Sequence, residues 1–171
     1  MKFILSFILA NILLNLGAKV NAQEKDTYDI LKNLVTKINK SISIADSSYP
    51  LEKYMLINSF QEFDLTRKEK RELLKNLKKT KGIRISQVQM ADLKLVSADT
   101  IFKLLEHVDT TNWEYFESIK PFYLFSAPVF FDHNNKAFVS LDLIGGMGYT
   151  ILYYKINNEW VVYTEKIRWV N

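Results

Sequence analysis

The residues best suited to acid–base chemistry in this 171-residue sequence are Asp132 and the adjacent His133, with Ser126 before them and Asp142 after. A histidine beside a carboxylate can act as a general base, and a nearby hydroxyl can serve as its nucleophile. The same residue types also form ordinary turns, and an exposed turn provides no burial to shift a pKa. We therefore interpret Asp132 and His133 as turn residues and predict no catalytic residue.

Metal and cofactor chemistry has little support in the composition. The chain contains two histidines and no cysteine, which excludes disulfides, thiolate nucleophiles, Cys-based zinc sites and iron–sulfur ligation. His107 falls at the predicted end of a helix, where the helix dipole favours an imidazolium. No His-Glu-x-x-His spacing occurs, so the sequence predicts neither a metal site nor a cofactor.

The glycine-rich segment Gly145-Gly146-Met147-Gly148 is a candidate for close approach of the backbone to a phosphate. A phosphate-binding loop needs a following helix whose first amides point at the anion, and here a strand is predicted to follow. We therefore expect a hairpin turn at this segment.

The segment from Arg67 to Arg84 contains nine basic residues and only two acidic ones, Glu69 and Glu72. Such a stripe can bind nucleic acid, anionic lipid or an acidic partner, or it can be the solvated face of a helix. No aromatic side chain is interleaved for base stacking, so nucleic acid is the least favoured partner. The partner-binding candidates are Lys75, Lys78 and Lys79.

Aromatic residues are abundant, with three Trp, nine Tyr and eleven Phe. A sheet face of Tyr and Trp can line an apolar ligand cavity or bind a protein. The alternative is that these side chains form the core between helices and sheet. The ligand-binding candidates on this face are Tyr123, Tyr149, Tyr153, Trp160 and Trp169.

The first half of the chain is predicted to be mainly helical. Apolar residues recur at helical spacing from Tyr28 to Ile42, and Asp26 or Thr27 can cap the start of that helix. Residues Leu51 to Phe60 are apolar but too short to assign between helix and strand.

A capping box, Thr66 with Glu69, predicts the start of a helix that ends near Gly82 in a left-handed conformation. Two further short elements are predicted, a strand over Ile83–Val88 and a helix over Thr100–His107 capped by Asp99 or Ser97.

The second half alternates strands with turn residues. Because Asn-rich two-residue turns favour tight hairpins, consecutive antiparallel pairing is expected. The predicted fold is α+β, with N-terminal helices packed on one side of a C-terminal four-stranded antiparallel meander and aromatics on the other. The four predicted strands are Ser126–Phe131, Ala137–Ile144, Tyr149–Ile156 and Trp160–Trp169.

The N-terminus has the profile of a signal peptide, with Lys2 followed by an apolar run to Leu16. Val20 and Ala22 predict cleavage after Ala22, which leaves a single domain over 23–171 and lowers the formal net charge from +4 to +2. The run is shorter than the about 20 residues of a membrane span. We expect a periplasmic or secreted protein with no permanent span, and the missing cysteine excludes a lipoprotein.

Four segments of the C-terminal half resemble a largely uncharacterised group of small exported bacterial proteins. They follow the pattern S-x-P-x-F, an Ala/Val strand, a Gly-rich turn and K-x-N-x-x-W, and some members of the group carry a Cys-Gly pair that this chain lacks. The order of elements is also similar to nuclear-transport-factor-2-like domains, a likeness of architecture that carries no function. The matching segments are Ser126-Ala127-Pro128-Val129-Phe130, Asn135-Lys136-Ala137-Phe138-Val139, Gly145-Gly146-Met147-Gly148 and Tyr154-Lys155-Ile156-Asn157-Asn158-Glu159-Trp160.

We interpret the protein as an exported, non-catalytic binding or envelope-associated module for a protein or a small apolar ligand. One alternative is a small enzyme of hydrolase or isomerase type with a cavity between sheet and helices. It requires ionisable groups such as Asp132, His133 and Asp142 to meet in a cleft. A second alternative is an adaptor that binds an acidic partner through the basic helix over residues 67–84.

Overall fold

The computed structural model describes residues 23–36, 42–85, 90, 93–106, 121–144 and 146–170, except the side chains of 104–106 and 169–170. The predicted signal peptide, His107 and Gly145 lie outside these residues, as does the side chain of Trp169. None of the described helices is long and apolar enough to cross a bilayer.

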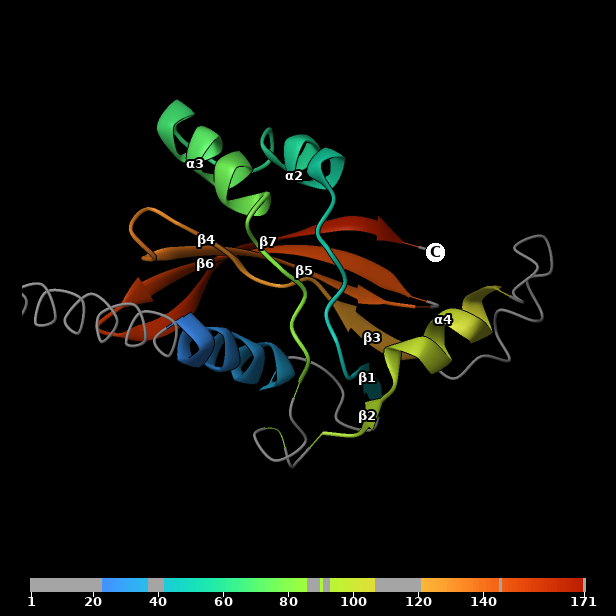
Figure 1. Cartoon of the computed structure of the whole chain (residues 1–171). Coiled ribbons are helices and arrows are strands. Elements are labelled where there is room, and N and C mark those ends of the chain that lie inside the picture. The colour runs from blue at the N-terminus through green and yellow to red at the C-terminus, as the bar shows by residue number, and fades with distance from the viewer. Residues whose placement is uncertain are drawn as a thin grey trace, which may run out of the picture.

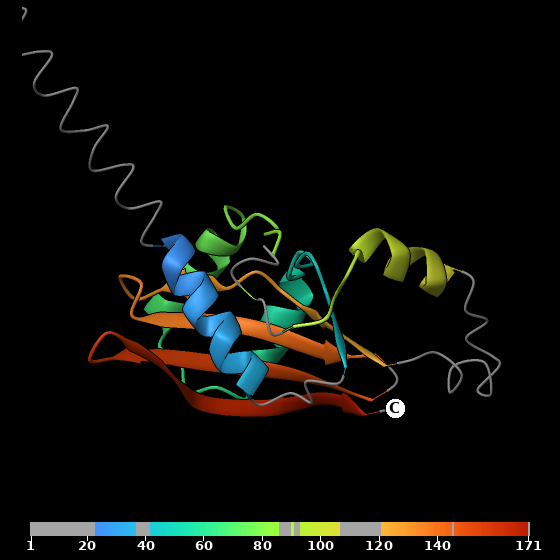
Figure 2. The same cartoon turned by 90° about the horizontal axis from the view of Figure 1, so that it is seen from below.

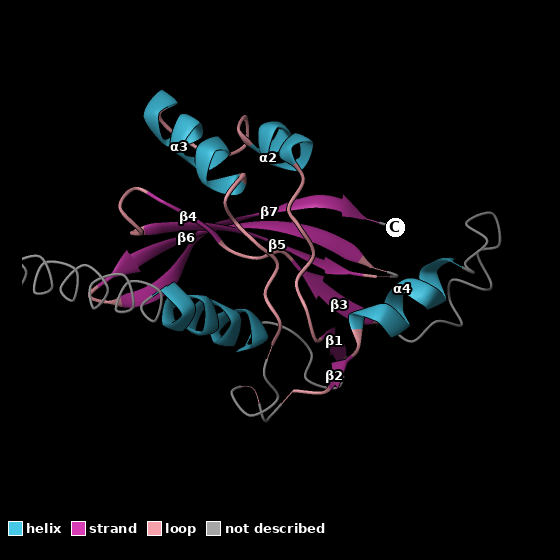
Figure 3. Cartoon of the chain, viewed as in Figure 1, coloured by secondary structure: helices cyan, strands magenta, loops and turns pink. Residues whose placement is uncertain are grey.

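Helices and a sheet form three layers, which confirms an α+β architecture (Figure 1). A helix over residues 23–36 covers one face of the sheet, and α2 and α3 cover the other, as the view from below in Figure 2 also shows. Helix α4 lies at the end of the sheet beside β1, β2 and β3 (Figure 3). The helix bounds are Lys53–Ser59 for α2, Arg67–Leu77 for α3 and Ala98–Glu106 for α4.

The sheet has seven strands, in the order β2-β1-β3-β5-β6-β7, with β4 pairing with β5 beside β3. Strands β4 to β7 form the expected antiparallel meander, whereas β1 pairs in parallel with both β2 and β3. The strand bounds are Ser43–Ala45 (β1), Leu95–Val96 (β2), Phe122–Phe125 (β3), Val129–Phe131 (β4), Lys136–Leu143 (β5), Met147–Ile156 (β6) and Glu159–Val170 (β7).

The prediction of four strands was wrong for two physical reasons. Strands β1 and β2 are too short to show an alternating pattern. The predicted strand Ser126–Phe131 begins instead at Val129, and a further strand, β3, precedes it. The two are separated because the pairing with β5 shifts by one residue between Phe125↔Leu141 and Val129↔Phe138, and residues 126–128 form the bend between β3 and β4. Pro128 has no N–H to donate to a ladder. At the bend the Ser126 hydroxyl accepts the backbone N–H of Ser140 at 2.9 Å, which keeps β5 hydrogen-bonded there.

Alternation along β5 shows why both faces of the sheet are buried. Ala137, Val139 and Leu141 belong to the core beneath the helix over 23–36. Phe138 packs instead with residues of α2 and α3. The expectation that helices cover one side only is therefore corrected, since each face has its own helical layer and its own apolar core.

The helix starts were predicted with mixed success. The capping box is present, with the Glu69 carboxylate accepting the Thr66 backbone N–H at 2.7 Å and also pairing with Lys136 of β5. The helix ends at Leu77, well before Gly82, and the left-handed end predicted near Gly82 does not form, since Lys78 is right-handed and Gly82 has no positive φ.

Two other predictions for the first half differ from the structure, and one segment left unassigned is a helix. Asp26 and Thr27 lie inside the first helix, so neither is its cap. The ambiguous Leu51–Phe60 segment contains α2, and Ile83–Val88 is reduced to a bridge between Arg84 and Ser47 in its described part.

Candidate functional site

The acid–base candidates are not brought together by the fold. Asp132 and His133 lie in the turn between β4 and β5, with φ angles of 51° and 57°, and His133 is exposed. Asp142 lies at the opposite end of β5, about 20 Å away at the rise of an extended strand. Ser126 is fully buried and its hydroxyl holds the backbone of Ser140. These residues form no general base–nucleophile arrangement.

Asp142 belongs instead to a buried polar cluster that the sequence did not predict. The Tyr49 hydroxyl donates to its Oδ2 at 2.7 Å, and the Arg168 guanidinium donates to its Oδ1. The side chains of Asp142 and Arg168 are 10% and 16% exposed. Burial, and then the nearby carboxylate, raise the pKa of Tyr49, so its hydroxyl stays protonated as a donor. The charge in this cluster is therefore balanced inside the protein.

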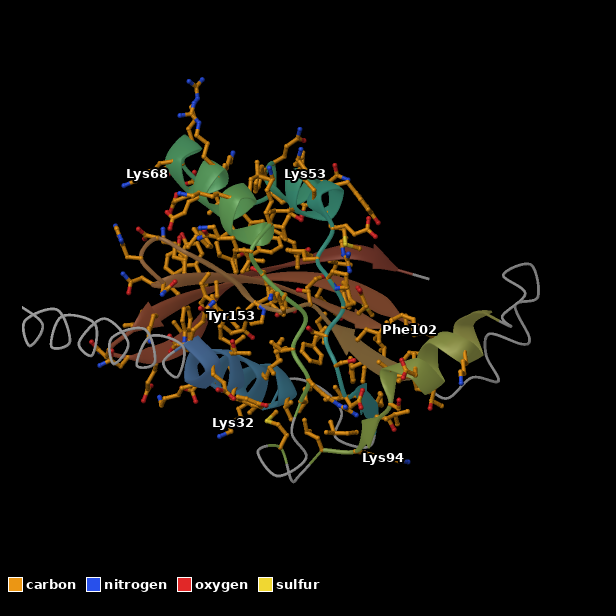
Figure 4. All side chains as sticks on the ribbon, viewed as in Figure 1. Lys32, Lys53, Lys68, Lys94, Phe102 and Tyr153 are labelled. Carbon is orange, nitrogen blue, oxygen red and sulfur yellow. The ribbon has the colours of Figure 1, made fainter. Side chains whose placement is uncertain are left out.

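Most of the aromatic candidates do come together, under the helix over residues 23–36. Tyr123, Tyr153 and Trp160 are buried in that core, and Tyr149 packs against it half-buried. Figure 4 places Tyr153 between the sheet and this helix. Its hydroxyl is buried without a hydrogen-bond partner among the described residues, and burial raises its pKa. Ligand binding by this face stays a prediction.

One contact in this region ties the first helix to the sheet. The Asp26 carboxylate accepts the indole N–H of Trp160 at 3.1 Å and the ammonium of Lys155 at 2.6 Å, both on the same Oδ1. The side chain of Asp26 is 12% exposed and that of Lys155 22% exposed. This ion pair holds the helix against β6 and β7.

An open cleft of about 520 Å³ lies between this helix and the segment that follows α3. The first turns of the helix form one wall, the segment after α3 forms the other, and the bend between β3 and β4 forms the floor. Its lining residues are Gln23, Glu24, Thr27, Tyr28, Lys79, Thr80, Lys81, Ile83, Arg84, Ala127, Pro128 and Phe130.

The wall after α3 carries three cations, Lys79, Lys81 and Arg84, against the single carboxylate of Glu24. All four side chains are exposed. Arg84 lies 3.5 Å from Asp46 but is itself 84% exposed, so this pair is loose. Positive charge therefore stands beside a floor that is mainly apolar.

A second hollow of about 230 Å³ adjoins the cleft and extends toward the β4–β5 turn. It adds Asn76 of α3 and the exposed Asn134 of the turn to the lining. The residues that line both hollows are Gln23, Lys79, Thr80 and Phe130.

The structure divides the partner-binding candidates. Lys79 lines both hollows, whereas Lys75 and Lys78 are exposed near the end of α3 and do not line the cleft. Lys81 and Arg84 belong to the basic stripe over residues 67–84, so the charge pattern of the sequence could have indicated this wall of the cleft. The opposite wall had no signal, because nothing in the sequence indicates that Thr27 and Tyr28 lie across from Lys81.

Within the described ranges, no group of three or more potential ligand residues is arranged to hold a metal ion. Comparison with protein-family models, with curated proteins and with solved structures gave no match in any of the three.

Proposed function

We propose that the protein is an exported, non-catalytic binding module and that the cleft between the first helix and the segment after α3 is its ligand site. The observation that carries the proposal is the open position of Lys79, Lys81 and Arg84 beside an apolar floor. The buried charges of Asp142 and Asp26 have partners within the chain, whereas Lys79 and Lys81 are exposed and Arg84 is exposed apart from its loose pair with Asp46.

The chemistry of the lining defines the class of ligand. The half-buried Ile83 and Tyr28 provide apolar surface above the buried Ala127, Pro128 and Phe130, and a hydrophobic body gains free energy there by leaving water. The neighbouring cations favour a carboxylate or sulfonate at its edge. The cleft therefore suits a ligand that combines an apolar body with negative charge.

Non-catalytic binding is favoured by what the cleft lacks for acid–base work. Among its described lining residues it carries one carboxylate, Glu24, and no histidine. A general acid and base need two ionisable groups that converge on the substrate, and here the exposed Glu24 stands on the wall opposite the exposed Lys79 and Lys81. The lining offers cations for attraction and apolar atoms for contact, which are the components of a binding site.

Titration with anilinonaphthalene sulfonate tests the proposal, because this probe combines an apolar body with one sulfonate. We expect saturable fluorescence enhancement with the folded protein. The double variant Lys79→Glu/Lys81→Glu should weaken the affinity about tenfold, since two attractive charges become repulsive.

The matched control is Lys75→Glu/Lys78→Glu, which makes the same change in net charge on residues outside the cleft. We expect it to bind like the wild type. If both double variants lose affinity equally, the probe binds through the overall positive charge of residues 67–84 and not at the cleft. If neither loses affinity, the cleft is not the ligand site.

Export is proposed on the sequence alone, from the apolar run to Leu16 and the small residues Val20 and Ala22. Expression of the full chain in a bacterium followed by intact mass measurement of the periplasmic fraction tests it. We expect a mature chain that starts at Gln23. Recovery of the unprocessed chain in the cytoplasm would contradict export.

A further inference from the structure

We infer that the occupant of the cleft is an extended acidic peptide segment of a partner protein, with an apolar side chain as its anchor. This inference rests on the proposed function and specifies the ligand of the same site. Three features of the described residues carry it: the continuity of the two hollows, the position of the cations, and the state of the neighbouring strand edge.

The shape of the site favours a chain over a compact small molecule. Sites for small molecules enclose most of the ligand's surface. Here the cleft of about 520 Å³ and the hollow of about 230 Å³ share Gln23, Lys79, Thr80 and Phe130 and both open to solvent. An elongated, open path of this kind accommodates a segment that enters at one end and leaves at the other.

The two hollows differ in chemistry: the larger one suits the side chains of a peptide and the smaller one suits its backbone. The larger one has the apolar floor around Pro128 together with Lys81 and Arg84, which suits an apolar side chain flanked by carboxylates. The smaller one adds the side-chain amide of Asn134 and the Oδ1 acceptor of Asn76, whose amide nitrogen donates to Phe130; these groups can pair with peptide N–H and C=O groups. Lys79 lies where the two hollows join.

The edge of β4 beside this path is already protected. The Asn76 side-chain amide donates to the backbone carbonyl of Phe130 at 2.8 Å, and Pro128 has no N–H to offer. A peptide therefore cannot extend the sheet along β4 as an added strand without displacing Asn76. Recognition must come from side-chain contacts and charge, which makes an acidic sequence with an apolar anchor the matching partner.

The test uses the exported protein and a fluorescein-labelled peptide of sequence Glu-Glu-Phe-Glu-Leu-Glu-Glu, followed by fluorescence anisotropy. We expect saturable binding that weakens about tenfold in Lys79→Glu/Lys81→Glu and is unchanged in Lys75→Glu/Lys78→Glu. Replacing Phe and Leu of the peptide by Ser should weaken binding about fivefold or more through loss of the anchor. Replacing its Glu residues by Lys should abolish binding.

A third variant, Asn134→Gly, separates a peptide from a compact ligand. Glycine accepts the φ angle of 65° at this position, so the turn is kept while the amide is removed. We expect a severalfold loss of peptide affinity with unchanged affinity for anilinonaphthalene sulfonate, which fits in the larger hollow alone. Equal peptide affinity in this variant would overturn the path through the second hollow.

The outcomes distinguish failure of the inference from failure of the proposed function. If anilinonaphthalene sulfonate binds at the cleft but the peptide does not, the ligand is a small apolar anion and the peptide inference is wrong. If neither the peptide nor anilinonaphthalene sulfonate binds, the cleft is not a ligand site and both proposals fall. Peptide affinity that is unchanged in both double lysine variants would also overturn the inference.

Discussion

The cleft and the Asp142 cluster both contain charged side chains, but those of the cluster are paired inside the fold and those of the cleft are exposed to solvent. In the cluster, the Asp142 carboxylate is held by Tyr49 and Arg168 within the fold. In the cleft, Lys79 and Lys81 project into solvent beside an apolar floor. Removal of one charge of the first kind destabilises the fold, because its partner is left buried and unpaired, whereas charges of the second kind are available to a ligand.

This difference predicts which property each substitution changes. Loss of one partner from a buried pair leaves the other charge in a poorly solvated place and lowers the free energy of unfolding. Loss of an exposed cation costs the fold little, because water already screens it. Stability and ligand affinity should therefore respond separately in the two regions.

The largest expected effect is that of Asp142→Ala, which leaves the Arg168 guanidinium and the Tyr49 hydroxyl without their shared acceptor. We expect the free energy of unfolding, measured by urea titration, to fall by about 3–5 kcal/mol. The exposed Asp64→Ala serves as control. If Asp142→Ala is as stable as the wild type but no longer binds the probe, the assignment is wrong, because the cluster would then serve ligand binding and not stability.

Asp26→Ala should give the next largest effect. Its carboxylate serves both Lys155 and the indole of Trp160, so we expect a loss of about 2 kcal/mol in unfolding free energy. Hydrogen exchange should accelerate most in the helix over residues 23–36. Because Thr27 and Tyr28 of this helix line the cleft, probe affinity should fall as well. Unchanged exchange in this helix would show that the contact is not what holds it.

Glu69→Gln should cost about 1 kcal/mol near neutral pH, because the capping box weakens while Lys136, which loses its pair with Glu69, keeps Asp132 at 3.6 Å. Burial works to raise the pKa of Glu69, but hydrogen bonds from Lys136 and Thr66 outweigh it and hold that pKa below its ordinary 4.5. The carboxylate therefore contributes stability above pH 4.5 that is lost as the pH falls through its lowered value.

The ion pair of Glu69 with Lys136 also keeps its contribution to stability at alkaline pH until the Lys136 ammonium loses its proton. Burial alone would lower the pKa of Lys136, but Glu69 and Tyr154 outweigh it and raise that pKa above 10.5, so its contribution is complete below this value. Melting temperatures measured from about pH 7 to about pH 3 should fall less steeply in Glu69→Gln than in the wild type. Parallel profiles would show that Glu69 is not the group responsible.

The smallest expected effect is the salt dependence of ligand binding. Raising NaCl from about 50 to about 500 mM should weaken probe affinity severalfold, because exposed charges are screened over a few ångströms at high salt. In Lys79→Glu/Lys81→Glu this dependence should disappear or reverse. Affinity that does not change with salt would mean that the apolar floor alone binds the probe.

Local sequence patterns were sufficient for the parts of the fold that local interactions determine. The turn at Asn157 and Asn158 has φ angles of 51° and 65°, as a two-residue hairpin turn requires. The Thr66–Glu69 capping box forms as predicted, since both partners lie within one helical turn. The long strands β5, β6 and β7 were also predicted within a few residues, because their apolar runs are bounded by turn residues.

The missed features all depend on residues far apart in the chain. Tyr49 and Asp142 are separated by 93 positions and Asp26 and Trp160 by 134, so no periodicity connects them. Asp26 illustrates the difficulty, because an acidic residue near a predicted helix start was interpreted as a cap when its real partners lie on the sheet.

The sequence by itself determined an α+β chain with an antiparallel C-terminal meander and a basic stripe over residues 67–84, because alternation, turn types and charge are local properties. The tertiary structure decided which charges are buried and paired, since nothing local in the sequence shows that the anion Asp142 is buried against Arg168 while the cation Lys79 is exposed. It also placed the first helix opposite Lys79, Lys81 and Arg84. A cleft exists only between two segments, so its chemistry could not be derived from either one alone.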